Sequence, residues 1–167
     1  MNIFKKLAGQ TAIYGSSSII GRFLNFLLTP LYALQFTNEQ YGIITEMYAY
    51  VAFLVVLLTY GMETSYFRFS TIKENKSADV YANTLYSLFT SSSVFILLIT
   101  IFSQNIANWL QYPDHFEYII WFGIIVALDA ISSIPLAKLR SEFKAKKFAL
   151  VNFANVGVNI SLNLFFI

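Results

Sequence analysis

Five long apolar stretches separated by short polar connections dominate the pattern of hydrophobic and polar positions along the chain. They cover residues 11–34, 41–62, 84–103, 116–137 and 148–167. An α-helix rises 1.5 Å per residue, so about 20 apolar residues cross roughly 30 Å of bilayer hydrocarbon. Membrane-spanning strands would alternate apolar and polar positions, and runs such as Phe53–Leu58 do not alternate. The pattern therefore predicts an all-α, polytopic transmembrane helix bundle with about five spans.

Composition excludes the other broad classes. Only 12% of the 167 residues are charged and 57% are hydrophobic, whereas a soluble domain has roughly 25% charged residues. The absence of cysteine excludes disulfides, thiolate metal sites and a cysteine nucleophile. A net charge of +2 gives no reason to expect nucleic acid as a partner.

The basic residues predict the orientation of the bundle. Lys and Arg accumulate in the cytoplasmic connections of membrane proteins. Ten of the eleven basic residues fall in the N-terminal segment or in alternate connections on one side, namely Lys5, Lys6, Arg68, Lys73, Lys76, Lys138, Arg140, Lys144, Lys146 and Lys147. We therefore expect the N-terminus to lie inside.

The eleventh basic residue, Arg22, lies at the centre of the first predicted span, and Asp129 lies near the centre of the fourth. An ionisable side chain inside a span costs about 2.5–3.5 kcal/mol on insertion scales, which makes it a functional candidate. Ser91–Ser93, Asn155 and Asn159 fall at a similar depth in the third and fifth spans. A hydrated cavity at mid-membrane would explain this common level, although Arg22 and Asp129 could also form a structural pair.

Helical spacing places the polar residues of the first and fifth spans on single faces. The two rows are Gly15, Ser18, Arg22, Asn25 and Thr29, and Asn152, Asn155, Asn159 and Asn163. Small and amide residues also mediate helix packing in membranes, so both packing and cavity lining remain open for the amides and serines. Glu46 and Glu63 are further candidate charge partners, the former about 9 Å from mid-membrane and the latter at the inner interface beside Arg68.

The residue inventory favours binding over catalysis. A guanidinium is a planar fork of donors suited to phosphate oxygens, and amides and hydroxyls can hydrogen-bond sugars. The single histidine, His115, lies in a connection, and no nucleotide-binding or zinc-binding motif is present. We expect no enzyme activity, no metal and no cofactor.

Several segments together resemble the first helices of bacterial polysaccharide and O-antigen flippases, members of the multidrug/oligosaccharidyl-lipid/polysaccharide exporter superfamily. The segments are Ala12–Gly15, Gly21–Tyr32, Glu39–Gly42, Tyr60–Phe69 and Asp129–Arg140 followed by Phe148. Each is loose alone, and their order and spacing carry the resemblance.

The resemblance implies a two-lobed bundle in the bacterial inner membrane that flips a polyprenyl-diphosphate-linked oligosaccharide by alternating access. Residues 1–167 would form an incomplete first lobe, and the chain alone would not be a competent transporter. Membrane lipids and other polysaccharide-assembly membrane proteins are candidate partners.

The expected site comprises substrate contacts from Arg22, Asn25, Asn155 and Asn159, with Asp129, Glu46 and Glu63 as coupling or charge partners. A cation-coupled multidrug antiporter of the same superfamily, and an inactive fragment or membrane scaffold, are the alternatives.

Overall fold

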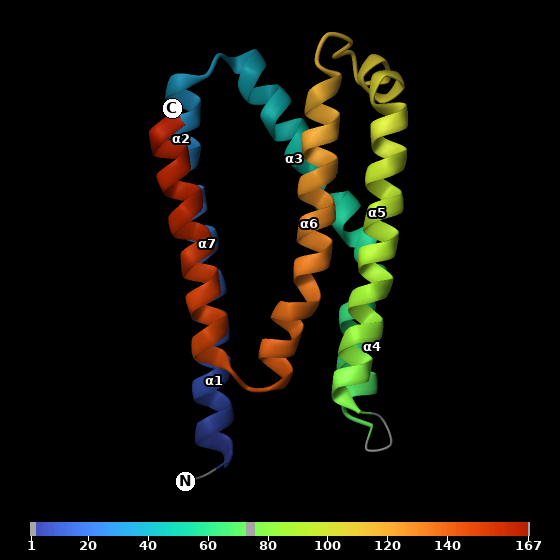
Figure 1. Cartoon of the computed structure of the whole chain (residues 1–167). Helices are drawn as coiled ribbons and strands as arrows, with labels where there is room; N and C mark the ends of the chain where they lie inside the picture. Colours follow the sequence, from blue (N-terminus) through green and yellow to red (C-terminus); the bar gives the residue numbers. More distant parts are fainter. Residues whose placement is uncertain (1–2, 73–75, 167) are drawn as a thin grey trace. The chain divides into compact units, whose positions relative to one another are not determined.

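The computed structural model describes residues 3–72 and 76–166, and within these ranges it does not describe the side chains of residues 3–8, 25 and 166. Every element in the described ranges is an α-helix (Figure 1). The helices are α1 (Ile3–Phe26), α2 (Leu28–Gln35), α3 (Asn38–Thr59), α4 (Met62–Ser70), α5 (Ser77–Trp109), α6 (Phe116–Ser141) and α7 (Ala145–Phe166).

Within the described residues, five helical segments are long and apolar enough to cross a membrane, which confirms the predicted fold class. They are Gly9–Gln35, Asn38–Ser70, Ser77–Trp109, Phe116–Ser141 and Ala145–Phe165. The third segment extends beyond the predicted 84–103 at both ends, because polar residues near the membrane surface continue the helix that the apolar run begins.

Two of these segments contain a break with a local cause. The first breaks at Leu27 between α1 and α2, since Pro30 has no N–H to donate to the carbonyl of Phe26. The second breaks after α3, where Tyr60 and Gly61 adopt positive φ angles of 31° and 74°. Glycine adopts this left-handed conformation at no steric cost, so the chain turns there before α4 begins.

The described chain forms two compact units, which we treat separately. One comprises Met1–Ile44 and Leu139–Ile167, and the other comprises Thr45–Lys138.

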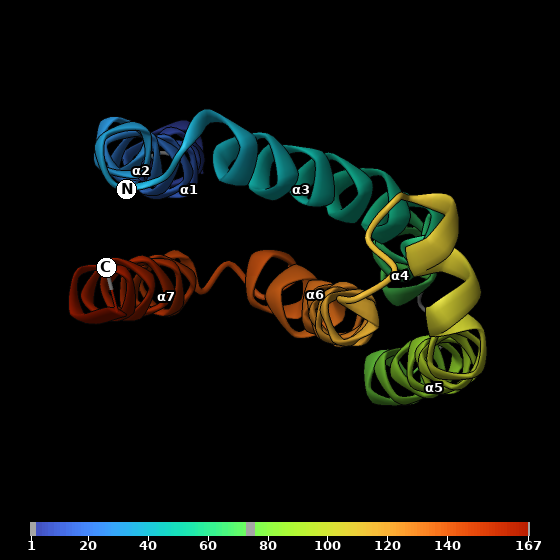
Figure 2. The ribbon, with the colours of Figure 1, turned by 90° about the horizontal axis from the view of Figure 1, so that it is seen from above.

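In the first unit, α1 and α7 pack along their length and appear side by side in the view along the helices (Figure 2). Tyr14 contacts Phe148 edge-to-face with ring centroids 5.1 Å apart, and further along both helices Gly21 lies against Val156. Beyond α1, the Tyr32 hydroxyl of α2 donates to Asn163 Oδ1. The contacting residues follow one another in the same order along both helices, so α1 and α7 run in the same direction.

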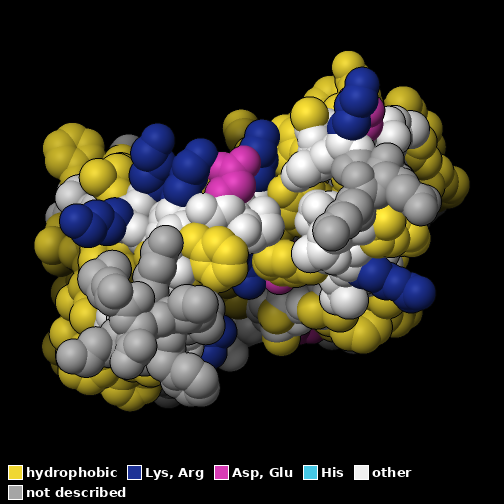
Figure 3. Space-filling model, turned by 90° about the horizontal axis from the view of Figure 1, so that it is seen from below, with side chains coloured by type: hydrophobic (Ala, Val, Ile, Leu, Met, Phe, Trp, Pro, Cys, Tyr) yellow, Lys and Arg dark blue, Asp and Glu magenta, His cyan; other side chains and the backbone are white. Residues whose placement is uncertain are grey.

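The parallel arrangement puts the start of α1 and the basic connection before α7 at the same end of this unit. That connection and its flanks include Arg140, Lys144, Lys146 and Lys147, and Lys144 forms an ion pair with Glu142. Lys and Arg side chains are prominent on the face seen from this end (Figure 3). The orientation of this end relative to the membrane stays a prediction. The side chains of Lys5 and Lys6 lie outside those described, as does Lys73.

In the second unit, α4, α5 and α6 surround a small apolar core. Tyr66, Leu88, Ile134 and Ala137 are fully buried, with Met62, Phe67, Val80, Tyr81 and Leu85 packed against them. On α6 the buried positions recur at helical spacing and several are small, including Gly123, Ala127 and Ala130. A Cβ on Gly123 would lie 2.8 Å from Ile99 Cγ2, so α5 uses the missing side chain to approach α6 closely.

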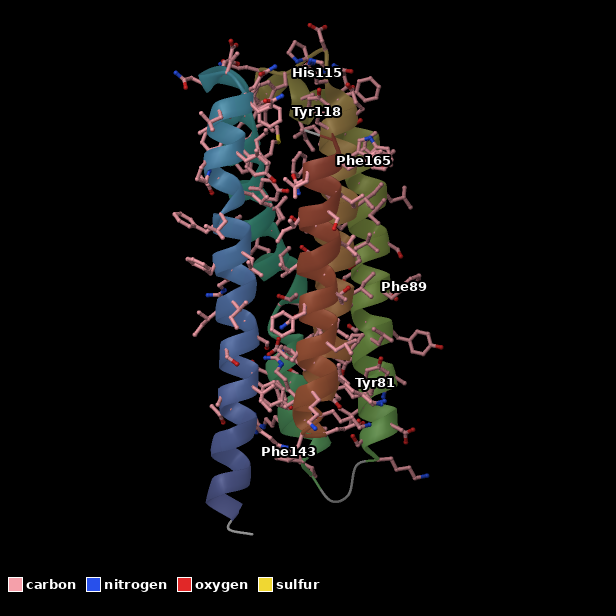
Figure 4. The ribbon with its side chains drawn as sticks, turned by 90° about the vertical axis from the view of Figure 1, so that its left-hand side faces the viewer. Tyr81, Phe89, His115, Tyr118, Phe143 and Phe165 are labelled. Atoms are coloured by element: carbon pink, nitrogen blue, oxygen red, sulfur yellow. The ribbon has the colours of Figure 1, made fainter. Side chains whose placement is uncertain are left out.

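Aromatic side chains of this unit also occupy its surface. Phe89 of α5 is 58% exposed and points away from the helix (Figure 4). At the start of α6 the rings of His115 and Tyr118 stack 4.7 Å apart, and His115 Nδ1 lies 3.2 Å from Glu117 Oε1. The only histidine is therefore held by its immediate neighbours.

Candidate functional site: the polar side of the α1–α7 pair

Arg22 is the middle residue of the first membrane-spanning segment, Gly9–Gln35. Its side chain is exposed, and no side chain described in its own unit forms a hydrogen bond or ion pair with it. A charged guanidinium at this depth needs water, an anion or another polar partner, because hydrocarbon cannot solvate it.

Close packing of α1 on α7 fixes which part of α7 lies level with Arg22. A Cβ placed on Gly21 would lie 3.2 Å from Val156 Cγ2, and both residues are buried. Asn155 is the middle residue of its own span, Ala145–Phe165. Arg22 and Asn155 therefore lie at the same level, one residue away from this contact on each helix.

The phase of each helix decides the side on which these residues lie. At 100° per residue, Ser18 and Arg22 of α1 lie roughly 60° and 100° to one side of Gly21, which contacts α7. Thr29 of α2 follows on the same side, because Leu27 between the two helices keeps right-handed helical backbone angles. On α7, Asn155 and Asn159 are rotated about the helix axis away from Val156, the residue that contacts α1, and this rotation has the opposite sense to that of Arg22 on α1. Because the helices run in the same direction, opposite displacements lead to the same side of the pair, which we call the polar side.

The polar side differs from the other side of the same pair. The other side, which we call the apolar side, carries Ile20, Leu27 and Leu31 from the first segment and Phe153, Ile160 and Leu164 from α7. Above and below the level of Arg22, the polar side holds apolar residues of α7, namely Val151 and Leu162. The amides are thus concentrated near Arg22.

The asparagine row of α7 has two different environments. Asn155 and Asn159 are exposed. Asn163 instead packs α7 against α2: its Oδ1 accepts from Tyr32, and its Nδ2 donates to Asn159 O at 2.8 Å and to Asn159 Oδ1 at 3.1 Å. The packing interpretation is therefore correct for Asn163, whereas Asn155 can still meet a ligand. Asn25 belongs to α1, but its side chain lies outside those described.

The hydroxyls of Ser91 and Ser93 on α5 bond to the backbone of their own helix. Ser91 Oγ donates to Leu88 O at 3.1 Å and Ser93 Oγ donates to Phe89 O at 2.8 Å. Ser92 is fully buried, and its Oγ has no hydrogen-bond partner among the described residues. Hydroxyls that bond to their own helix backbone need no external partner. For the serines of α5, the packing alternative is therefore better supported than cavity lining.

Asp129 is a central residue of the span Phe116–Ser141 and is exposed on α6. It belongs to the second unit, whereas Arg22 belongs to the first. A pairing of Asp129 with Arg22 stays a prediction.

The Glu46 carboxylate, in contrast, has identified partners within its unit. Tyr50 OH donates to Oε1 at 3.0 Å, and Tyr112 OH donates to Oε2 at 2.8 Å. Tyr50 follows Glu46 by one helical turn, so the sequence could have indicated it. Tyr112 lies 66 residues away in the α5–α6 connection, and no local signal links it to Glu46.

Glu63 occupies the first turn of α4, directly after the left-handed Gly61. A carboxylate at this position interacts favourably with the helix dipole. This position favours a carboxylate at the start of α4, and a coupling role for Glu63 stays a prediction.

The described residues contain no cluster of three or more His, Asp or Glu side chains able to hold a metal ion. The polar side offers one fixed cation and several amides and hydroxyls. Such a set can bind an anion that also carries hydrogen-bonding groups.

A family model described as polysaccharide biosynthesis protein matches residues 35–166. The chain belongs to this polysaccharide biosynthesis protein family. Together with the five apolar helices of the described residues, membership makes it a multi-pass membrane protein of polysaccharide biosynthesis. A search of curated proteins and a search of solved structures gave no match.

The family match covers most of the candidate site residues but not Arg22. It begins at Gln35 and so includes Glu46, Glu63, Asp129 and both exposed amides of α7. Arg22 precedes the matched residues, so its candidacy rests on its depth, its charge and its position beside α7.

Proposed function

We propose that the protein is a flippase that moves a lipid-diphosphate-linked oligosaccharide from the inner to the outer leaflet of the bacterial inner membrane. The observation that carries the proposal is Arg22, a permanent cation at mid-span, level with Asn155 on the polar side of the α1–α7 pair. Membership of a polysaccharide biosynthesis family supplies the class of substrate.

The chemistry of the polar side suits the two parts of such a substrate. The Arg22 guanidinium can donate two parallel hydrogen bonds to diphosphate oxygens, which are stronger in a low-dielectric site than in water. Asn25, Asn155 and Asn159 carry amides that both donate and accept, as sugar hydroxyls do. We assign the diphosphate to Arg22 and adjacent sugars to the amides.

Transport requires the site to open alternately to each side, by rocking of one part of a bundle against another. We propose that Asp129, Glu46 and Glu63 act as charge partners or coupling residues in this cycle. Among these, Asp129 is the strongest candidate, because it is central in its span and exposed.

The test replaces Arg22 in the gene at its native locus and measures surface polysaccharide. Arg22→Ala should lower export at least tenfold, because the diphosphate loses its only mid-span cation on this helix. Arg22→Lys should retain part of the activity, since it keeps the charge but loses the planar fork. Arg68→Ala, which removes an exposed basic residue on α4, is the matched control and should leave export unchanged.

Unchanged export with Arg22→Ala, at normal protein abundance, would refute the diphosphate role. The antiporter alternative instead predicts drug efflux that depends on Glu46 or Asp129, which a drug-susceptibility panel measures. It has weaker support, because two tyrosine hydroxyls already bind the Glu46 carboxylate.

A further inference from the structure

A cavity with polar and apolar walls lies in the second unit, between α4 and α5 at the end where the predicted cytoplasmic connection joins them. Its volume is about 710 Å³, within the roughly 300–1,000 Å³ typical of small-molecule sites. Its lining residues are Met62, Ser65, Phe69, Lys76, Asp79, Val80, Asn83, Thr84 and Ser87. We call this cavity the α4–α5 groove.

Helical spacing explains why the two walls of the groove differ. On α5, Asp79, Asn83 and Ser87 recur every four residues and form one polar row. On α4, Met62, Ser65 and Phe69 recur at three and four residues and form a mainly apolar row. A ligand in the groove would meet hydrogen-bonding groups on one side and apolar surface on the other.

Most of the polar groups in the groove are available to a ligand. Among the described residues, the side chains of Ser65, Lys76, Asp79 and Asn83 form no hydrogen bond with another side chain or with the backbone. Thr84 donates to Val80 O at 2.7 Å, and Ser87 and Tyr60 share a 2.7 Å hydrogen bond.

The charges in the groove select the type of ligand. Lys76 and Asp79 cancel each other, and the remaining polar groups are an amide and hydroxyls. A diphosphate would meet the Asp79 carboxylate, and a cation would meet Lys76, so neither is favoured. A neutral polyhydroxyl compound both donates and accepts hydrogen bonds, so it can bond to the Lys76 donor and to the Asp79 acceptor.

We propose that the α4–α5 groove binds neutral sugar units of the lipid-linked oligosaccharide at the cytoplasmic surface, before the diphosphate reaches Arg22. This inference rests on the proposed function and adds a loading site to it. The groove would hold neutral sugar units before translocation, and the amides beside Arg22 would meet sugars only once the diphosphate has reached mid-span.

The absence of cysteine from residues 1–167 allows a direct test by single-cysteine labelling. Ser65→Cys reports on the groove, and Thr64→Cys is the matched control, because Thr64 is exposed on α4 but does not line the cavity. Each variant is made in the complete protein, with any other cysteine replaced. A membrane-impermeant maleimide is then applied to inside-out vesicles.

Two kinds of vesicle are compared. One comes from cells that make the lipid-linked oligosaccharide, and the other from cells in which transfer of the first sugar phosphate to the polyprenyl carrier is blocked. We expect the oligosaccharide to slow labelling of Ser65→Cys at least threefold and to leave Thr64→Cys unchanged. Equal labelling of Ser65→Cys in both vesicles would overturn the proposal.

A further arm tests anionic lipid headgroups as the occupant. Ser65→Cys protein is reconstituted with phosphatidylcholine alone or with added phosphatidylglycerol, and without oligosaccharide. Slower labelling caused by phosphatidylglycerol would overturn the sugar assignment, whereas equal labelling supports it. If Arg22→Ala abolishes export while oligosaccharide leaves Ser65→Cys labelling unchanged, the groove proposal fails and the flippase proposal stands.

Discussion

Helix α5 and the α1–α7 pair both carry polar side chains at the middle of a membrane span, but they satisfy them differently. In α5, Ser91 and Ser93 donate to carbonyls of their own helix. On the α1–α7 pair, Arg22 and Asn155 are exposed and have no such backbone partner. Polar residues at one depth therefore do not all line one cavity.

The difference follows from the length and chemistry of the side chains. A serine hydroxyl is close enough to reach the carbonyl three or four residues earlier, and it then needs nothing from outside the helix. A guanidinium has five donors and no acceptor, and the ordinary helical backbone cannot satisfy it. Arginine and asparagine at mid-span are accordingly stronger indicators of a site than serine.

We expect the largest loss of stability and export from a substitution that separates α1 from α7. Gly21→Leu would force a large side chain against Val156, where even a Cβ would lie 3.2 Å from Cγ2. Overpacking of this kind costs about 1–3 kcal/mol, and we expect a lower unfolding temperature in detergent and lower export.

Gly15→Leu on the same helix is the matched control, because nothing lies within 4 Å of a Cβ at that position. The unfolding temperature of Gly15→Leu should stay close to that of the original protein. Gly21→Leu combined with Val156→Ala should recover part of the loss, and equal destabilisation by the two glycine substitutions would contradict the packing described here.

Replacing the mid-span amide of Asn155 should have a smaller effect, but a larger one than replacing the hydroxyl of Ser93. Asn155→Ala should lower export severalfold, because it removes an exposed amide level with Arg22. Ser93→Ala should change neither export nor stability by much, the latter by less than about 0.5 kcal/mol, since surface substitutions away from special features are usually this mild. Equal loss of export in both variants, scored as surface polysaccharide, would remove the distinction.

The fold could be predicted from the sequence because hydrocarbon thickness dictates the length of an apolar helix. The two breaks also have local causes, at Pro30 and Gly61. The depth of Arg22 followed from counting along its span, and the structure places Asp129 at the centre of its span. Depth and phase within one helix are local properties, so they are readable from sequence.

Contacts between distant segments could not be predicted in the same way. Tyr32 and Asn163 are 131 residues apart, and their bond assigns one member of the asparagine row to helix packing. Tyr112 reaches Glu46 from a connection whose path depends on how α5 and α6 end. Pairing of this kind depends on helix–helix geometry, which a single sequence does not encode in any local pattern.

The central claim is that the α1–α7 pair has a water-facing polar side and a dry apolar side. Single cysteines at Ser18 and Thr29, and at Ile20 and Leu27, test it in the complete protein by their rates of reaction with a membrane-impermeant maleimide. We expect Ser18→Cys and Thr29→Cys to react at least tenfold faster than Ile20→Cys and Leu27→Cys. Equal rates at all four positions, or faster reaction on the apolar side, would contradict it.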